Sequence, residues 1–286
     1  MGTLLLVAAL LLRSAAGEAL DPSRAVRVSW RPRAFLYKGF LSEPECDHLV
    51  ALAKEGGLRK STVVDGKSGG NVMSEARTSS GMFLDKKQDD VVARIEERIA
   101  AWTFLPPENG ETLQILRYKN GEKYLPHFDN TAGPRQGLGG HRVATVLMYL
   151  SHVKMGGETI FPSSEGKLTQ PKDETWSECA NSVYGVKPVK GDALLFFSLH
   201  PNATEDPDSV HGSCPVVEGE KWSATKWIHE RSFERPQTAP GAECHDEDAM
   251  CPVWAAAGEC AKNPGYMVGR RGSPGFCRRS CDACAS

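Results

Sequence analysis

The chain has 286 residues, which is enough for one large domain and one small one. Its 34 lysines and arginines nearly balance its 36 aspartates and glutamates. No long run of like charge interrupts this balance, so the sequence excludes the basic footprint of a nucleic-acid-binding protein.

The first residues are typical of a targeting segment. An apolar run of about ten residues ends at Leu12 and is followed by Arg13 and small residues up to Gly17. That run is too short to cross the roughly 30 Å core of a bilayer, so residues 1–17 are expected to be a secretory signal peptide. A short signal-anchor is the alternative. Either assignment places the protein in the endoplasmic reticulum, in the lumen or anchored in the membrane, with the Golgi or secretion as further alternatives.

Two helices are expected in the first third of the chain. The sequence Ser42-Glu43-Pro44-Glu45 forms a capping box with proline in the first turn. A second helix is predicted over 87–102, where apolar residues recur at helical spacing. Residues 60–77 between them are rich in glycine, serine and charge, which predicts a mobile loop, either a plain connection or a lid.

Short strands follow. They are expected at 113–118, 143–150, 193–198 and 222–229, with glycine-rich breaks between them. The middle two are almost wholly apolar, as in strands buried on both faces. Many short strands with tight turns indicate a sandwich or jelly-roll barrel. Residues 25–235 are therefore expected to form one α+β domain.

The sequence His127-Phe128-Asp129 is the strongest chemical signal. In an extended segment His127 and Asp129 point to the same side, and His211 from a distant strand can complete three ligands. Two histidines and one carboxylate suit non-haem Fe(II), because open coordination positions are left. Lys221 lies ten residues beyond His211 and can hold the far carboxylate of an acid bound to the iron. The alternative is a chance set of polar residues at strand ends.

The cysteines indicate an oxidising compartment. Six of the nine lie in residues 244–284, after a Pro/Gly hinge at 236–243. A module this small needs disulfides, and the sequence alone permits fifteen pairings. A zinc site is the competitor, which the oxidising context disfavours.

Cys46, Cys179 and Cys214 form an odd set outside this module. A Cys179–Cys214 bridge is one possible pairing, and at least one thiol is expected to be free or to pair between chains. Asn202-Ala203-Thr204 is a sequon, so Asn202 is a candidate glycosylation site.

These motifs resemble a known family. Residues 117–129 (RYKNGEKYLPHFD) resemble the iron segment of prolyl 4-hydroxylases, and matches in the correct order extend over about 30–232. The tail resembles an ShK toxin-like (ShKT) domain, which plant and algal members often carry. The resemblance implies a double-stranded β-helix (jelly-roll) core with flanking helices. It also implies the use of Fe(II), O2 and 2-oxoglutarate, with ascorbate as reductant, to make 4-hydroxyproline, succinate and CO2.

The resemblance also assigns roles. His127, Asp129 and His211 would bind iron. Lys221 would pair with the C5 carboxylate of 2-oxoglutarate, and Tyr118 and Thr159 would hydrogen-bond it or line its pocket. The residues implied to line a peptide groove are Arg77, Glu111, Tyr124, Arg142, Trp227 and His229. Such a groove suits Pro-rich chains in polyproline II form. The implied tail disulfides are Cys244–Cys284, Cys251–Cys277 and Cys260–Cys281.

The leading hypothesis is a procollagen-proline 4-dioxygenase-type enzyme that acts on Pro-rich secretory proteins of the extensin or hydroxyproline-rich glycoprotein kind. A 2-oxoglutarate oxygenase acting on another target, such as lysine or a small molecule, is the alternative; Lys221 and the groove matches count against it. A catalytically inert binding protein acting through the tail is a third reading, which the complete ligand set disfavours.

Overall fold

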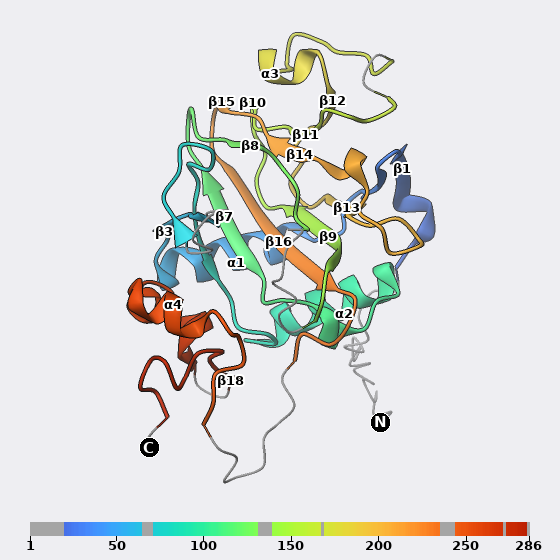
Figure 1. The fold of residues 1–286 in the computed structure, drawn as a ribbon. Helices are drawn as coiled ribbons and strands as arrows, with labels where there is room; N and C mark the ends of the chain where they lie inside the picture. Colours follow the sequence, from blue (N-terminus) through green and yellow to red (C-terminus); the bar gives the residue numbers. More distant parts are fainter. Residues whose placement is uncertain are drawn as a thin grey trace, which may run out of the picture.

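The computed structural model describes residues 20–64, 71–130, 139–166, 169–234, 244–270 and 273–284 (Figure 1). The predicted signal peptide and linker lie outside these ranges. Two main sheets pack against each other, and two long helices cover the larger one. Mixed helices and antiparallel sheets agree with the expected α+β class. Among the described residues, no helix combines the length and the apolar character needed to cross a bilayer.

The elements of the described chain are short apart from two helices and a few central strands. The helices are α1 (Glu43–Gly56), α2 (Asp90–Thr103), α3 (Glu178–Asn181), α4 (Cys251–Ala256), α5 (Glu259–Lys262) and α6 (Pro264–Met267). The strands are β1 (Ala25–Trp30), β2 (Arg33–Tyr37), β3 (Arg59–Lys60), β4 (Val63–Val64), β5 (Asn71–Val72), β6 (Ser80–Phe83), β7 (Gln114–Tyr118), β8 (Tyr124–His127), β9 (Arg142–Tyr149), β10 (Met155–Gly156), β11 (Thr159–Phe161), β12 (Tyr184–Val186), β13 (Ala193–Phe197), β14 (His211–Ser213), β15 (Val216–Glu218), β16 (Lys221–His229), β17 (Gly269–Arg270) and β18 (Ser273–Pro274).

The larger sheet has the order β1-β2-β13-β9-β16-β7-β6-β3, and the smaller one has the order β12-β11-β14-β8. Neighbouring strands in both are antiparallel. The four strands predicted from the sequence are the central strands β13, β9, β16 and β7 of the larger sheet, and each bound agrees within one residue. Two of them, β9 and β13, stand out because burial on both faces makes their sequences almost wholly apolar.

The residues at which the two long helices begin follow from their N-terminal caps. The predicted capping box at α1 is present, since Ser42 Oγ accepts from the Glu45 N–H and the Glu45 carboxylate accepts from the Ser42 N–H. The predicted start of α2 at residue 87 is wrong. Lys87 has a φ of 51°, which a right-handed helix does not allow. Asp89 caps the helix instead and accepts from the N–H groups of residues 91 and 92.

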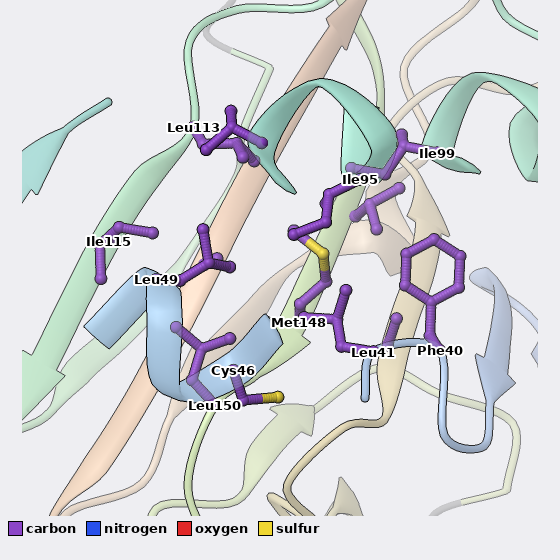
Figure 2. Close-up of a cluster of buried hydrophobic side chains, with 14 of the residues drawn as sticks. Phe40, Leu41, Cys46, Leu49, Ile95, Ile99, Leu113, Ile115, Met148 and Leu150 are labelled. Atoms are coloured by element: carbon purple, nitrogen blue, oxygen red, sulfur yellow. The ribbon is translucent and has the colours of Figure 1, made fainter. Parts of the chain in front are cut away.

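One buried cluster joins both helices to the larger sheet. Figure 2 shows Cys46 and Leu49 of α1 and Ile95 and Ile99 of α2 packed around Met148 of β9. The opposite face of the larger sheet packs on the smaller sheet through a second cluster of aromatic and aliphatic side chains. Because side chains alternate along a strand, each central strand serves the helices with one face and the space between the sheets with the other.

Strand β16 is buried on both of its faces, since all nine of its residues are buried. Trp222, Ala224 and Ile228 belong to the helix-side core. On the same side, Lys226 Nζ lies 2.5 Å from Glu96 Oε1 of α2, with side-chain exposures of 4% and 7%. This buried ion pair connects α2 to the centre of the sheet. The opposite face carries Lys221, Trp227 and His229.

Four disulfides are present. The tail pairs Cys244 with Cys284, Cys251 with Cys277 and Cys260 with Cys281, which is the pattern that the resemblance implies. Cys179 is bonded to Cys214, and Cys46 is free and buried in α1. The single leftover thiol is thus in the core, where an intermolecular disulfide cannot reach it.

The Lys226–Glu96 pair leads to a stability prediction. Lys226→Met leaves the Glu96 carboxylate buried without its cation, and we expect a loss of about 3–5 kcal/mol in the free energy of unfolding. The double variant Lys226→Met/Glu96→Met replaces the pair by apolar side chains and should recover most of that loss. Denaturant unfolding of the three proteins measures this, and equal losses in the single and double variants would contradict it.

Candidate metal centre and co-substrate pocket

Strands β8 and β14 bring the two histidines together. In this antiparallel pair His127 lies opposite His211 and Tyr124 lies opposite Ser213, so the register shifts between them. Pro126 fits such an irregularity because it has no N–H to contribute to the ladder. Gly212 is needed there, since a Cβ at that position would lie 2.9 Å from the Tyr124 carbonyl oxygen. The prediction that His127 ends one strand and His211 begins another is confirmed.

Backbone carbonyls orient both imidazoles in the same way. Nδ1 of His127 lies 2.9 Å from the Leu125 carbonyl oxygen, and Nδ1 of His211 lies 3.0 Å from that of Ser209. A carbonyl can only accept, so Nδ1 carries the proton in each ring and Nε2 keeps its lone pair. The two Nε2 atoms lie 3.6 and 3.5 Å from the carboxylate oxygens of Asp129.

Asp129 is buried and held by its neighbours. The Thr145 hydroxyl donates to its Oδ2 at 2.6 Å. Burial by itself would raise the pKa of Asp129, but the rings of His211 and His127 and the charge of Arg142 hold that pKa well below its usual range. Burial, together with His127 and Lys221, lowers the pKa of His211 to about 4 even beside Asp129. The histidine is therefore neutral and the aspartate ionised near pH 7.

This set fits a divalent transition metal. One ligand atom from each of His127, Asp129 and His211 lies within 4.8 Å of the other two. Two neutral imidazole nitrogens and one carboxylate on one face are the donors that non-haem Fe(II) takes, with positions left open. Thr145 was not recognisable from the sequence as part of the site. Its only signal was a polar residue within the apolar run 143–150.

Lys221 forms a second part of the site. Its side chain is 1% exposed, and its Nζ donates to Ser213 Oγ at 2.9 Å. Burial lowers the pKa of Lys221 to about 7, with Glu158 opposing that shift. No ion pair joins Lys221 to a carboxylate within the described residues. A buried ammonium group without a carboxylate partner has the chemistry to bind an anion.

The predicted partners of Lys221 surround it from both sheets. Tyr118 pairs with Lys221 across β7 and β16, and the Lys221 ammonium lies 5.3 Å from the centre of the Tyr118 ring. Thr159 pairs with Ser213, and its Oγ1 accepts a hydrogen bond from the Tyr149 hydroxyl at 2.9 Å. The residues grouped around Lys221 therefore include the predicted Tyr118 and Thr159 and two that the sequence did not indicate, Ser213 and Tyr149.

Four of the predicted groove residues form one network. Arg142 donates to both oxygens of Glu111, at 2.5 and 3.0 Å, and its guanidinium lies 4.1 Å from the Trp227 ring centre. His229 Nε2 lies 2.8 Å from Glu111. Burial alone would raise the pKa of Glu111. The charges and hydrogen bonds of Arg142 and His229 outweigh burial and lower this pKa to about 2.

A strand irregularity makes this network possible. Ile228 pairs with Ala144 and His229 pairs with Arg142, so Val143 is the extra residue of a β-bulge. Without it, Arg142 would share the helix-facing side of Ala144 and Val146. Both ring nitrogens of His229 have partners in this arrangement, because its Nδ1 faces the Gly140 carbonyl oxygen and its Nε2 faces Glu111.

Arg77 and Tyr124 lie against the metal ligands. The Arg77 guanidinium is 4.8 Å from the Tyr124 ring centre and donates to Gln114 at 2.8 Å. The Tyr124 ring stacks on His127 with centroids 3.6 Å apart. The prediction that 60–77 is one mobile loop is wrong for its described part, where β4 pairs with β5 and Arg77 bridges to Tyr124. Residues 65–70 lie outside the described chain.

Comparison with known proteins agrees with this geometry. The family described as the 2OG-Fe(II) oxygenase superfamily matches residues 113–229. Probable prolyl 4-hydroxylase 7 of Arabidopsis thaliana is 61% identical, with 96% of this chain and 86% of the relative covered. Prolyl 4-hydroxylase 2 of the same plant is 51% identical over 99% of this chain and 98% of its own length.

A solved structure is also similar. The viral collagen prolyl hydroxylase vCPH from Paramecium Bursaria Chlorella virus-1, in its 2OG complex, shares 26% identity with this chain. The match covers 68% of this chain and 94% of that protein, with a TM-score of 0.52.

The Thr145–Asp129 hydrogen bond leads to a prediction about metal affinity. Thr145→Val keeps the shape of the side chain but removes the donor, and we expect Mn(II) or Fe(II) to bind about 10- to 100-fold more weakly. Thr145→Ser keeps the hydroxyl and should bind nearly as the wild type. His211→Ala, which lacks a ligand, should bind least and show no turnover. Titration calorimetry of the metal-free proteins measures this, and equal affinities for the valine and serine variants would refute the role of the hydroxyl.

Proposed function

The chain belongs to the prolyl 4-hydroxylases of the 2OG-Fe(II) oxygenase superfamily, and we propose that it hydroxylates C4 of peptidyl proline in Pro-rich proteins of the secretory pathway. Enzymes of this kind are 2-oxoglutarate-dependent dioxygenases. Fe(II) together with 2-oxoglutarate and O2 supplies the oxidising power, and succinate and CO2 are released. The observation that carries the proposal is the buried Lys221 ammonium, which donates to Ser213 on β14, the strand that also carries His211 of the His-Asp-His set.

His127, Asp129 and His211 would hold the iron. Their donor atoms converge, both histidines present Nε2, and Thr145 fixes the carboxylate. In this proposal the two facing sheets make up a double-stranded β-helix, with the ligands on the smaller sheet. Packing against the larger sheet excludes water from that side of the site.

Lys221 would bind the C5 carboxylate of 2-oxoglutarate. The Ser213 hydroxyl, which accepts from Lys221, can turn its own proton toward that carboxylate. Thr159 accepts from Tyr149, so its hydroxyl proton is also available as a donor. Tyr118 would line the pocket with its ring. These residues bind and orient the acid, and they neither form nor break a covalent bond during turnover.

The peptide groove is proposed along Arg77, Glu111, Tyr124, Arg142, Trp227 and His229. Apolar side chains that are unusually exposed lie near its mouth: Leu125 and Phe128 flank His127 and are 46% and 48% exposed, and Met73 is 63% exposed. Exposed apolar and aromatic side chains suit proline rings of a polyproline II chain. The viral structural relative is named as a collagen prolyl hydroxylase, and collagen is a Pro-rich protein.

The proposal extends to the cell compartment. Four disulfides support folding in the secretory pathway, with residues 1–17 as a signal peptide or anchor and the endoplasmic reticulum as the location. Asn202 is exposed in a turn in which its side-chain oxygen accepts from Thr204, so a glycan has room there. The tail would be an ShKT domain, the reductant would be ascorbate, and the substrates would be extensin-like or hydroxyproline-rich proteins.

The activity is tested by 2-oxoglutarate turnover with oligoproline and extensin-like peptides, followed by mass spectrometry. The expected product is a peptide heavier by one oxygen atom at proline, in equal amount to succinate. Stoichiometric succinate without any modified proline would refute the proposed substrate class.

The pKa of Lys221 leads to a pH prediction. With a pKa of about 7 in the free enzyme, the lysine is mostly a cation below pH 7 and mostly neutral above it. Both carboxylates of 2-oxoglutarate stay ionised from about pH 6 to 9. The dissociation constant for 2-oxoglutarate should therefore rise above pH 7, by up to about tenfold per pH unit.

Calorimetry on the Mn(II)-loaded enzyme measures this dependence. Lys221→Arg is the matched control. Its guanidinium stays charged, so it should bind 2-oxoglutarate more weakly through its different shape but without a step near pH 7. A wild-type dissociation constant that does not change with pH would show that Lys221 does not bind the carboxylate.

The groove leads to a prediction about substrate length. Each further proline ring that packs on an aromatic side chain contributes about 0.5–1.5 kcal/mol, so KM should fall about 2- to 12-fold per added contact until the groove is full. Tyr124→Ala should flatten this dependence. A series of oligoprolines of increasing length measures KM, with Mn(II) affinity as the control for damage to His127. A length-independent KM in the wild type would favour a small-molecule oxygenase.

A further inference from the structure

The His229 ring is held from several sides. Its Nε2 lies 2.8 Å from Glu111 and its Nδ1 lies 2.8 Å from the Gly140 carbonyl oxygen. Gly139 approaches so closely that a Cβ there would lie 2.9 Å from the His229 side chain. Phe233 stacks on the ring with centroids 4.6 Å apart and planes 20° apart. The ring therefore has one orientation, which Phe233 helps to fix.

Phe233 in turn contacts the disulfide-rich tail. Its backbone N–H donates to the Glu108 carbonyl at 2.8 Å, so its position beyond β16 is fixed. Its ring lies 6.1 Å from that of Phe276, centroid to centroid. Phe276 stacks on Tyr266 at 4.4 Å, and Tyr266 meets Trp254 edge-on. Phe276 is also next to Cys277, which is bonded to Cys251. The tail thus presents a rigid aromatic surface to Phe233.

We infer that the tail module acts as a buttress for the peptide groove: Phe276, through Phe233, positions His229 and with it the Glu111–Arg142 pair. This inference rests on the proposed function, because the groove is where the effect would be felt. Glu111 receives His229 and both donors of Arg142, and Arg142 covers Trp227. A His229 ring that is free to turn would release one side of Glu111. The bound peptide would then have to order that network, which weakens its affinity.

Loss of the contact with the tail should affect chiefly the binding of the peptide substrate. Lys221 and His229 lie at opposite ends of β16, and eight residues of extended chain separate them by roughly 26 Å. The metal ligands lie on and next to β8 and β14 of the smaller sheet. Loss of the buttress is therefore expected to raise KM for the peptide while leaving KM for 2-oxoglutarate unchanged. Any change in metal affinity should be small, because Arg142 reaches Asp129 only at its backbone carbonyl oxygen, at 3.5 Å. Phe233 and Phe276 are positioning residues in this scheme, not catalytic ones.

The test uses the full chain with Phe233→Leu, Phe276→Leu and the double variant. Leucine keeps an apolar side chain in each place but removes the ring contact. We expect KM for a long oligoproline to rise about 2- to 12-fold in each single variant. The double variant should be no worse than Phe233→Leu alone, because both changes break the same chain of contacts. Val253→Ala, at a 51% exposed position in the same module, is the matched control and should match the wild type.

A second measurement does not depend on turnover. In the wild type the His229 ring protons lie under the Phe233 ring, so their NMR signals should be shifted by its ring current. In Phe276→Leu these signals should move toward their unstacked positions, and the Nδ1 proton should exchange faster with water. Disulfide mapping confirms that the tail is folded in each variant.

The outcomes are distinguishable. A wild-type enzyme that makes no hydroxyproline refutes the proposed function, and the NMR comparison still decides the positioning role. An unchanged peptide KM and unchanged His229 signals in Phe276→Leu, with all four disulfides intact, would overturn the buttress. A rise in KM for 2-oxoglutarate equal to that for the peptide would also overturn it, since that would indicate general loosening of the domain.

Discussion

The antiparallel pairing of β8 with β14 is the contact on which the candidate site depends. It sets two histidines from distant parts of the chain opposite each other and leaves Asp129 just past the strand end. The irregular register, with Gly212 facing the backbone of β8, brings the strands close enough for both Nε2 atoms to reach one point. Backbone carbonyls then set the tautomers, so the geometry does not rely on mobile side chains.

Strand β16 joins this site to the rest of the fold. It is buried throughout and carries charged groups on both faces, each stabilised differently. Lys226 is neutralised by Glu96 and anchors α2. Within the described chain the one hydrogen-bond partner of Lys221 is the neutral Ser213 hydroxyl, and burial lowers the pKa of Lys221 to about 7, which fits the proposed role in binding an acid. A protein that served only as a scaffold would gain stability by replacing Lys221 with an apolar residue, so its presence indicates function.

The proposed peptide groove is built as a network of paired charges and stacked rings. Glu111 is hydrogen-bonded to Arg142 and His229. The Arg142 guanidinium lies over the Trp227 ring and that of Arg77 over the Tyr124 ring. Phe233 stacks on the imidazole of His229. This network connects the proposed groove with the disulfide-rich tail. The tail is thereby part of the same contact system as the oxygenase domain, although cysteine spacing alone suggested a separate unit.

The sequence by itself predicted the His-Asp-His set, Lys221 as its companion, the four central strands and the two long helices. These signals are local or chemical: apolar runs, a capping box, and residue types that together suit a metal ion and the carboxylate of an acid. Tertiary structure alone decided the rest. Thr145, Ser213 and Tyr149 enter the site only because strands pair in one register, and Arg142 does so only because Val143 is bulged. Short strands such as β11 and β12 escaped detection because three residues carry no periodicity, and their pairing partners lie far away along the chain.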